Sequence, residues 1–345
     1  MTKGKKLLVA AGIVFFLFAA AVGVFAFQVH KWLQPVPAMA AEPVLVTIPA
    51  GSSSTGIAKI LADHGLIRNA TVFRLYAKYR GLDQKLQAGD YLFHFGMTMD
   101  EILEQLRKGN VYRPTVTVTI PEGFNVEQIA ERLQAQGLVE YDVFMGLARQ
   151  TVPSLGQVRE GQRYAIEGYL FPDTYEFDVN ATPEQILDRM LRRLEEIFTP
   201  DMRKRCQELG LEIHDVMTLA ALVEREAQVA AERELIAGVM HNRLQKNMPL
   251  QIDASVIYAL GKHKQVVSLE DLKVDSPYNT YKYPGLPPGP IASPGKAAIM
   301  AVLYPAETDY LYYVAKGDGS GEHYFGRTLS EHNANIKKAN ENRKR

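Results

Sequence analysis

Two segments of the chain repeat each other at an offset of 72 residues. Residues 44–66 and 116–138 align without a gap, and each predicts a strand, a Pro-x-Gly turn and a short amphipathic helix that ends at a glycine. The offset is too long for an ordinary solenoid, so the repeat predicts two related α+β modules. The identical pairs include Ile48 and Ile120, Pro49 and Pro121, Gly51 and Gly123, Ile57 and Ile129, Ala58 and Ala130, Leu61 and Leu133, and Gly65 and Gly137.

An N-terminal segment predicts a single membrane crossing. Residues 7–27 contain no charged residue, and about 20 apolar residues span a bilayer as a helix. Lys3, Lys5 and Lys6 precede this run, and positive residues tend to stay in the cytoplasm. The sequence therefore predicts a single-pass protein of the inner, cytoplasmic membrane, with the bulk of the chain on the periplasmic or extracytoplasmic side. A cleaved signal peptide is the alternative, because residues 38–40 resemble a cleavage site, but the apolar run is longer than a signal core.

The rest of the chain divides where its composition changes. A strand over residues 89–95 and a helix over residues 99–106 complete the first module, and an aromatic, turn-rich stretch begins near residue 164. The predicted fold class is therefore α+β, with the second copy as a partial duplicate of the first. The predicted parts are a cytoplasmic tail (1–6), a transmembrane helix (7–27), a linker rich in Pro and Ala (28–43), the first module (44–112), a second α+β subdomain (113–163) and a C-terminal domain (164–345).

Charge and composition argue against several functions. Lys plus Arg and Asp plus Glu each total 39, and no basic run interleaved with aromatic residues occurs, so nucleic acid is not an expected partner. Cys206 is the only cysteine, which leaves no intramolecular disulfide. Metal-binding and nucleotide-binding motifs are missing, so neither a metal nor a cofactor is expected. Ser293 and Lys296 fit the Ser-x-x-Lys pattern of penicillin-recognising enzymes, but the companion motifs of that class are missing.

A carboxyl group closes a helical run that is otherwise almost wholly apolar. Residues 216–226 predict a helix in which Glu226 shares its face with Leu219 and Leu222. Burial on such a face raises the pKa of a carboxyl and keeps it protonated near neutral pH, which is the state that a general acid needs. Glu224 lies about 200° away around the helix, so the two carboxyls cannot face one cleft.

The segments around this helix predict further elements. Residues 183–197 and residues 231–246 each predict a helix, and residues 309–327 alternate Tyr and Val before a Gly-rich turn, which predicts a hairpin. Residues 248–294 are rich in Gly, Pro, Tyr and Asn. A long segment of that composition is not expected to build a core, so it predicts a wall that faces the substrate.

Several short motifs occur in a fixed order from residue 171 to residue 295. They are Phe171-Pro172-Asp173-Thr174, Val223-Glu224-Arg225-Glu226, Asn242-Arg243-Leu244, Leu250-Gln251-x-Asp253-x-x-Val256-Ile257-Tyr258, Tyr278-Asn279-Thr280-Tyr281 and Gly285-Leu286-Pro287-Pro288-Gly289-x-Ile291-x-x-Pro294-Gly295. In this order they resemble the YceG-like endolytic murein transglycosylases, single-span proteins that cut peptidoglycan glycan strands. The resemblance covers nearly the whole chain. It implies a LysM-like peptidoglycan-binding fold for the first module and a lysozyme-like fold for the catalytic domain.

The resemblance also implies roles for individual residues. It places the catalytic acid at Glu226, and it makes Gln251 and the pair Tyr278 and Asn279 similar to motifs that line the cleft of lysozyme-like transglycosylases. One departure is Ala227, since related enzymes often carry Ser or Thr after the acid.

Each further candidate for substrate binding has a structural alternative. The structural alternative for Glu224 is an ion pair with Arg225 or Arg243. Asp253 is a possible second carboxyl for hydrolysis, or an acceptor at a helix cap. Tyr278 and Asn279 also fit plain turn residues after a proline.

A transglycosylase needs only one catalytic carboxyl. If the 6-hydroxyl of muramic acid attacks its own anomeric carbon, one carboxyl protonates the leaving oxygen and then accepts the hydroxyl proton, leaving a 1,6-anhydro end. We therefore expect cleavage between muramic acid and glucosamine units of nascent strands by Glu226, which terminates strand elongation. Penicillin-binding synthases are the protein partners that such a role suggests. The alternative from another class is a non-catalytic, membrane-anchored scaffold that holds a synthase complex near the glycan.

Overall fold

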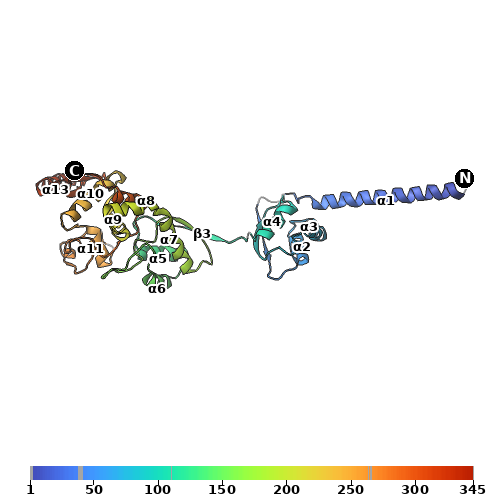
Figure 1. The fold of residues 1–345 in the computed structure, drawn as a ribbon, viewed down its shortest axis with the longest axis horizontal. Helices are drawn as coiled ribbons and strands as arrows, with labels where there is room; N and C mark the ends of the chain where they lie inside the picture. The colour runs from blue at the N-terminus through green and yellow to red at the C-terminus, as the bar shows by residue number, and fades with distance from the viewer. Residues whose placement is uncertain (1–2, 38–41, 110, 263, 265, 345) are drawn as a thin grey trace. The chain divides into compact units, whose positions relative to one another are not determined.

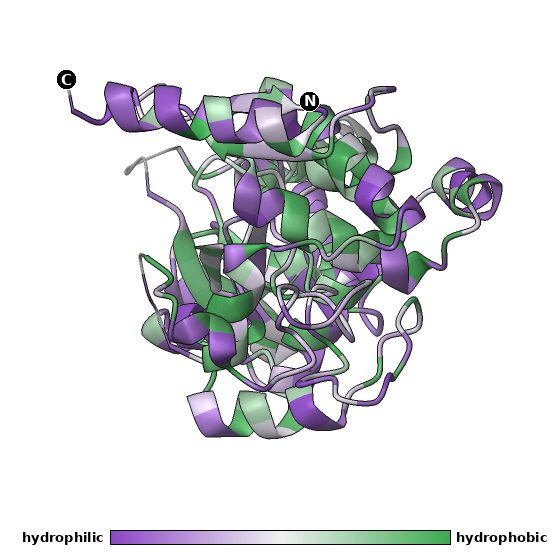
Figure 2. Ribbon diagram, turned by 90° about the vertical axis from the view of Figure 1, so that its left-hand side faces the viewer, coloured by the Kyte–Doolittle hydropathy of each residue, from purple (hydrophilic) through white to green (hydrophobic). Residues whose placement is uncertain are grey.

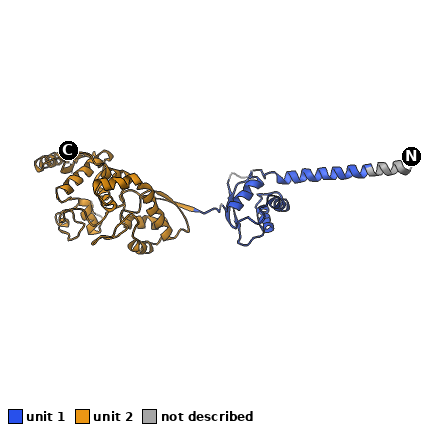
Figure 3. Ribbon diagram, in the orientation of Figure 1, with its two compact units in different colours: residues 1–114 blue, residues 115–345 orange. Residues whose placement is uncertain are grey.

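The computed structural model describes residues 3–37, 42–109, 111–262, 264 and 266–344. The chain divides into two compact units, residues 1–114 and residues 115–345 (Figure 3). Each unit has hydrophobic clusters of its own. The segment that resembles a cleavage site, residues 38–40, lies outside the described residues.

The first unit begins with α1, Lys3–Leu33, which Figure 1 shows as one continuous helix. Its segment Gly12–Leu33 is long and apolar enough to cross a membrane and is not buried by the rest of the protein. The helix continues past Phe27, where the sequence predicted the linker to begin. That boundary was wrong because residues 28–33 contain neither proline nor glycine, and Pro35 is the first residue that cannot continue a helix.

The first module is a two-stranded antiparallel sheet with three helices. Val46 in one strand lies opposite Tyr91 in the other, and both side chains are fully buried. Side-chain oxygens of Ser53, Asn69 and Thr98 cap the three helices, which fixes where each helix begins. The elements are β1 (Val44–Ile48), α2 (Ser54–Asp63), α3 (Ala70–Tyr79), β2 (Gly89–Phe93) and α4 (Met99–Lys108).

The second module repeats the same order of elements and the same strand register. Val118 lies opposite Tyr175, as Val46 lies opposite Tyr91, and each tyrosine donates its hydroxyl to the carbonyl oxygen four residues earlier. The duplicate is therefore complete, not partial as predicted, and its last strand and helix lie beyond residue 163. The elements are β3 (Thr115–Thr119), α5 (Val126–Ala135), α6 (Tyr141–Gln150), β4 (Thr174–Asp178) and α7 (Pro183–Ile197).

The remaining elements of the second unit surround α9. Residues 216–223 of this helix are all buried, and α8, α10, α11 and α12 contact it. The predicted helices and the predicted hairpin are confirmed. The C-terminal helix, α13, is largely hydrophilic (Figure 2). The elements are α8 (Pro200–Leu209), α9 (Ile213–Glu226), η1 (Ala230–Glu232), α10 (Arg233–Gln245), α11 (Asp253–Leu260), η2 (Asp271–Lys273), α12 (Lys296–Leu303), β5 (Tyr312–Ala315), β6 (His323–Gly326) and α13 (Leu329–Asn342).

The segment 248–294 is not the coreless wall that its composition predicted. It contains α11, and its residues Leu250, Ile252 and Ile291 belong to the same hydrophobic cluster as α9. The prediction failed because apolar residues are spaced between the glycines and prolines, and several of them, such as Leu250, Ile252 and Ile291, are buried without a long regular element.

A buried carboxyl ties the second module to the helices behind it. Glu167 accepts a hydrogen bond from the backbone N–H of Val126 at 3.0 Å and another from the Tyr258 hydroxyl at 3.0 Å. Burial raises the pKa of Glu167 to about 8, so the carboxyl is largely neutral at pH 7. The start of α5 and the body of α11 therefore share one buried hydrogen-bonding group.

Candidate active site

Glu226 is the last residue of α9, where the buried helix reaches the surface. The Ala227 N–H still bonds the Val223 carbonyl oxygen at 2.9 Å, and Ala227 then leaves the helix with an extended backbone. Glu226 is half-buried, and its carboxyl accepts a hydrogen bond from the Tyr313 hydroxyl of β5 at 3.0 Å. A helix with a buried and mostly apolar body thus presents the Glu226 carboxyl at its end, next to a phenol that fixes its orientation.

The surroundings of Glu226 keep part of it protonated at neutral pH. Burial, with a smaller contribution from the negative charge of Asp253, raises the pKa of Glu226 to about 7. The Tyr313 hydrogen bond and the positive charge of Arg225 oppose this shift by favouring the carboxylate. Desolvation outweighs both, which agrees with the predicted state of a general acid.

Asp253 is the first residue of α11 and lies on the exposed side of the site. Its carboxylate accepts a hydrogen bond from the Tyr281 hydroxyl at 2.6 Å. Burial and the neighbouring carboxylates raise the pKa of Tyr281, so the phenol stays a donor. Asp253 therefore acts on Glu226 through its charge, with one oxygen bonded to Tyr281.

Gln251 adopts a left-handed backbone, with φ of 56°, and is exposed. Its side-chain oxygen accepts a hydrogen bond from Arg243 at 3.2 Å. The same guanidinium donates to the carbonyl oxygens of Leu250 at 2.9 Å and Leu311 at 2.6 Å, so it joins this turn to the chain just before β5. No described residue accepts from the Gln251 side-chain amide, which leaves its N–H groups for a ligand.

Tyr278 and Asn279 are both buried, which differs from the predicted direct contact with substrate. The Tyr278 hydroxyl accepts the Arg163 N–H at 3.3 Å, and its ring packs on Tyr258 with centroids 4.9 Å apart. The Asn279 amide donates to two carbonyl oxygens of its own loop, at 2.8 and 2.9 Å, and its oxygen accepts the Tyr281 N–H at 3.1 Å. These bonds are the turn role that the sequence also allowed, and they hold Tyr281 in place.

Glu224 faces the second module, away from Glu226. Its side chain is 8% exposed, accepts the Gly295 N–H at 3.1 Å and lies 3.9 Å from the Arg233 guanidinium. Burial and the charge of Glu122 raise the pKa of Glu224. The ion pair expected with Arg225 or Arg243 forms with Arg233 instead, because η1 turns the chain back toward α9.

The Pro-x-Gly turn of the second module docks at the end of α9. The Gly123 N–H donates to the Ser293 carbonyl oxygen at 2.8 Å, and the Ser293 N–H donates to the Phe124 carbonyl oxygen at 2.7 Å. Arg225 donates to the Gly123 carbonyl oxygen at 3.2 Å. Ser293 therefore holds two chain segments together at the entrance to α12, while Lys296 is exposed.

Tyr313 and Tyr281 are the site residues that sequence reasoning missed. Tyr313 lies in the predicted hairpin and Tyr281 ends the Tyr-Asn-Thr-Tyr motif, but nothing in either pattern says which tyrosine approaches a carboxyl. Among the residues that the structure describes, no group of three or more His, Cys, Asp or Glu side chains is arranged to hold a metal ion.

Comparisons with known proteins identify related chains. Residues 46–338 match the model of the YceG-like family. The chain is 38% identical over 318 residues to the endolytic murein transglycosylase of Bacillus subtilis (strain 168), a match that covers 87% of this chain and 86% of that protein. It is 35% identical over 359 aligned residues to the endolytic murein transglycosylase of Streptococcus pneumoniae serotype 2 (strain D39), covering 96% of this chain and 65% of that protein.

A solved structure gives the same result for the fold. The crystal structure of a putative YceG-like protein from Listeria monocytogenes superposes with a TM-score of 0.60 at 36% sequence identity. The match covers 86% of this chain and 99% of that chain.

Proposed function

The chain belongs to the YceG-like family, and from this premise we propose that it is an endolytic murein transglycosylase whose general acid is Glu226. The relatives carry that activity in their names, at 34% to 38% identity over most of this chain. One observation supports Glu226 as the acid. It is a half-buried carboxyl with a pKa of about 7, held by a phenol at the end of an apolar helix.

The first step is protonation of the leaving oxygen. A protonated Glu226 donates to the glycosidic oxygen between muramic acid and glucosamine, and the bond to the anomeric carbon breaks as positive charge develops there. Glu226 becomes a carboxylate in this step. The Tyr313 hydroxyl, which donates to that carboxyl at 3.0 Å, strengthens its bond as the negative charge appears.

The second step needs no further carboxyl. The 6-hydroxyl of the same muramic acid attacks the anomeric carbon, and the Glu226 carboxylate accepts its proton, which restores the acid and leaves a 1,6-anhydro end. Because the attacking group is part of the substrate, proximity replaces the second catalytic residue of a hydrolase. Asp253 raises the pKa of Glu226 and has one oxygen bonded to Tyr281, which supports an electrostatic role for it.

The other predicted residues then differ in whether they contact the substrate or hold neighbouring residues in place. The free N–H groups of Gln251 supply donors for an acetamido sugar beside Glu226. Tyr278 and Asn279 act indirectly, by holding the loop that carries Tyr281. Glu224 fixes the chain near Gly295 and the second module, and the pair Glu224 and Arg233 keeps that carboxyl away from the reacting bond.

Features of the rest of the chain support a position of this chemistry at the cell wall. We infer that α1 anchors the protein in the inner membrane with its N-terminus in the cytoplasm, since lysines precede the apolar run. The LysM-like role of the first module, the lysozyme-like relation of the second unit and an association with penicillin-binding synthases are proposals that rest on the family resemblance.

Mass spectrometry of the fragments released from purified peptidoglycan tests the proposal. The wild-type chain is compared with Glu226→Gln, which keeps the shape of the side chain and removes its acid proton. We expect anhydro-muramic ends from the wild type alone. Reducing ends would assign hydrolysis and a direct role to Asp253, whereas no fragments from either protein would favour the scaffold.

A further inference from the structure

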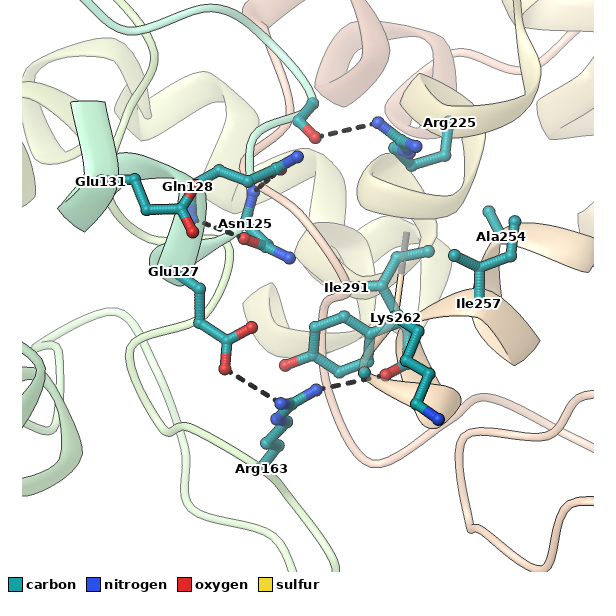
Figure 4. Close-up of a pocket in the computed structure, with 13 residues that line it drawn as sticks. Asn125, Glu127, Gln128, Glu131, Arg163, Arg225, Ala254, Ile257, Lys262 and Ile291 are labelled. Carbon is teal, nitrogen blue, oxygen red and sulfur yellow. Dashed lines mark hydrogen bonds and ion pairs between the residues drawn. The ribbon is translucent and has the colours of Figure 1, made fainter. Parts of the chain in front are cut away.

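A charged pocket that the proposed mechanism does not use lies at the end of α9 that carries Glu226. The pocket has a volume of about 250 Å³ and lies between α5, the end of α9 and α11 (Figure 4). Acidic side chains of α5, Glu127 and Glu131, form one wall. Arg225 and Lys262 contribute positive charge from the other elements, so the pocket has opposite charges on opposite sides.

Two of these charged side chains have no ion-pair or hydrogen-bond partner within the described part of the chain. Glu127 is paired with Arg163 at 2.9 Å. Glu131 and Lys262, in contrast, are exposed and make no ion pair or side-chain hydrogen bond within the described part of the chain. One free carboxylate and one free ammonium therefore line the same pocket.

The uncharged part of the pocket has the character of a peptide-binding surface. Ala254, Ile257 and Ile291 supply apolar lining. The side-chain oxygens of Asn125 and Gln128 accept each other's backbone N–H at 3.0 and 2.8 Å, which leaves both side-chain amides free to donate to carbonyl oxygens.

The pocket shares two chain elements with the reaction site. Arg225 directly precedes Glu226 on α9, and Ala254 directly follows Asp253 on α11. Consecutive Cα atoms are about 3.8 Å apart, so the backbone of these lining residues directly adjoins that of Glu226 and Asp253. A stem of three residues reaches roughly 10 Å when extended, which is more than twice that spacing.

We propose that this pocket binds the stem peptide of the muramic acid that is cut, with the free amine of its diamino acid on Glu131 and its carboxylates on Arg225 and Lys262. This inference rests on the proposed function. The acetamido sugars of the glycan carry no charge once the lactyl group is linked to a peptide, so a pocket with both signs of charge has no partner among them. The stem peptide carries carboxylates and, where it is not cross-linked, an amine. The pocket would then favour strands whose stems are not cross-linked.

Peptide titration tests the pocket directly. The full-length Glu226→Gln chain in detergent is titrated by calorimetry with a soluble alanyl-glutamyl-diamino acid tripeptide and with the same peptide acetylated on its side-chain amine. Acetylation should weaken binding by about tenfold or more, the loss expected for one charge-assisted hydrogen bond. Glu131→Gln should weaken binding of the unacetylated peptide by the same factor as acetylation does. In this variant the two peptides should therefore bind with the same affinity.

Matched variants separate the pocket from general surface charge. Lys262→Gln should weaken binding of both peptides, whereas Glu140→Gln and Lys246→Gln, which change exposed charges outside the pocket, should change neither. Equal affinity for the two peptides, or equal affinity in all four variants, would overturn the proposal.

A cleavage assay with the wild-type catalytic residue keeps the two proposals distinguishable. Strands with stems should be cut several-fold faster than strands stripped of their peptides, and Glu131→Gln should reduce this preference without removing anhydro ends. If the tripeptide does not bind and both kinds of strand are cut equally fast, the pocket proposal is wrong and the proposed function stands. If neither strand is cut, the proposed function fails, and the titration alone decides the pocket.

Discussion

The two copies of the repeated module fold alike but differ in what covers their Pro-x-Gly turns. In the first copy Pro49, Ala50 and Gly51 are all exposed. In the second copy Gly123 is buried, because Ser293 bonds its N–H and Arg225 bonds its carbonyl oxygen. The fold of the module therefore does not decide whether its turn is a free surface or part of a site. Whether the turn is covered depends on residues far along the chain, which, in the part that the structure describes, form hydrogen bonds to the second turn and not to the first.

The two turns also differ in the side chain at their middle position. Ala50 of the first copy corresponds to Glu122 of the second, and the Glu122 charge raises the pKa of Glu224. A methyl group in the first copy has no such effect. The second module thus contributes both backbone and charge next to the end of α9.

The largest expected effect comes from a substitution of the proposed general acid, Glu226, in the second unit. Glu226→Gln should lower the cutting rate by about 10²- to 10⁴-fold, the usual contribution of a general acid, and is measured as anhydro ends released per hour. Asp63→Asn, which changes an exposed carboxyl of the first module, is the control and should cut at the wild-type rate. A comparable loss in both variants would mean that the chemistry is not confined to the second unit.

Protein stability should not explain the loss in Glu226→Gln. The folded-state pKa of Glu226, about 7, lies above the ordinary value of 4.5, so ionising the group costs stability as pH rises through that window. Glutamine removes the cost. Thermal unfolding above pH 7 should therefore find the variant at least as stable as the wild type.

The pH profile of cutting separates the two neighbours of Glu226. Activity should fall as pH rises through about 7, because the acid must be protonated. Asp253→Asn removes a charge that raises the pKa and should move this limb to lower pH. Tyr313→Phe removes a bond that lowers the pKa, so it should move the limb to higher pH and slow the reaction about tenfold. Shifts of the same sign would show that another group controls the limb.

A matched pair of glycine substitutions tests the turns themselves. Gly51 and Gly123 have φ of 77° and 78°, so an alanine at either position costs about 1–2 kcal/mol of unfolding free energy in its own unit. Around Gly51 an added Cβ meets nothing within 4 Å, whereas at Gly123 it lies 3.6 Å from Arg225. Calorimetry should record similar destabilisation, and only Gly123→Ala should slow cutting, by a few-fold. Equal cutting by both variants would remove the second turn from the site.

The smallest expected effect tests the likeness of the two modules. Tyr91 and Tyr175 make the same hydroxyl to carbonyl bond, so each change to Phe should cost about 1 kcal/mol in its own unit. Denaturant unfolding of the two variants measures this. If only one of the two variants lost unfolding free energy, the two hydrogen bonds would share their geometry but not their contribution to stability.

Much of the local structure could be predicted from the sequence. The repeat gave the strand, turn and helix of both modules because their glycines and apolar residues remain in register. Its second half was missed because only a Tyr-x-Phe pattern, Tyr91 with Phe93 and Tyr175 with Phe177, remains alike at a different offset. The substrate role given to Asn279 was a motif inference, and a motif does not report that an amide is already bonded within its own loop.

The sequence by itself determined which carboxyl ends the apolar helix and which segment is able to span a membrane. Both follow from the order of apolar residues along one element, which is local information. Only the tertiary structure decided that Tyr313 holds Glu226, that Arg233 pairs with Glu224 and that the second turn joins the site. Those contacts link residues 9 to 102 positions apart, and such pairing depends on packing that no local pattern encodes.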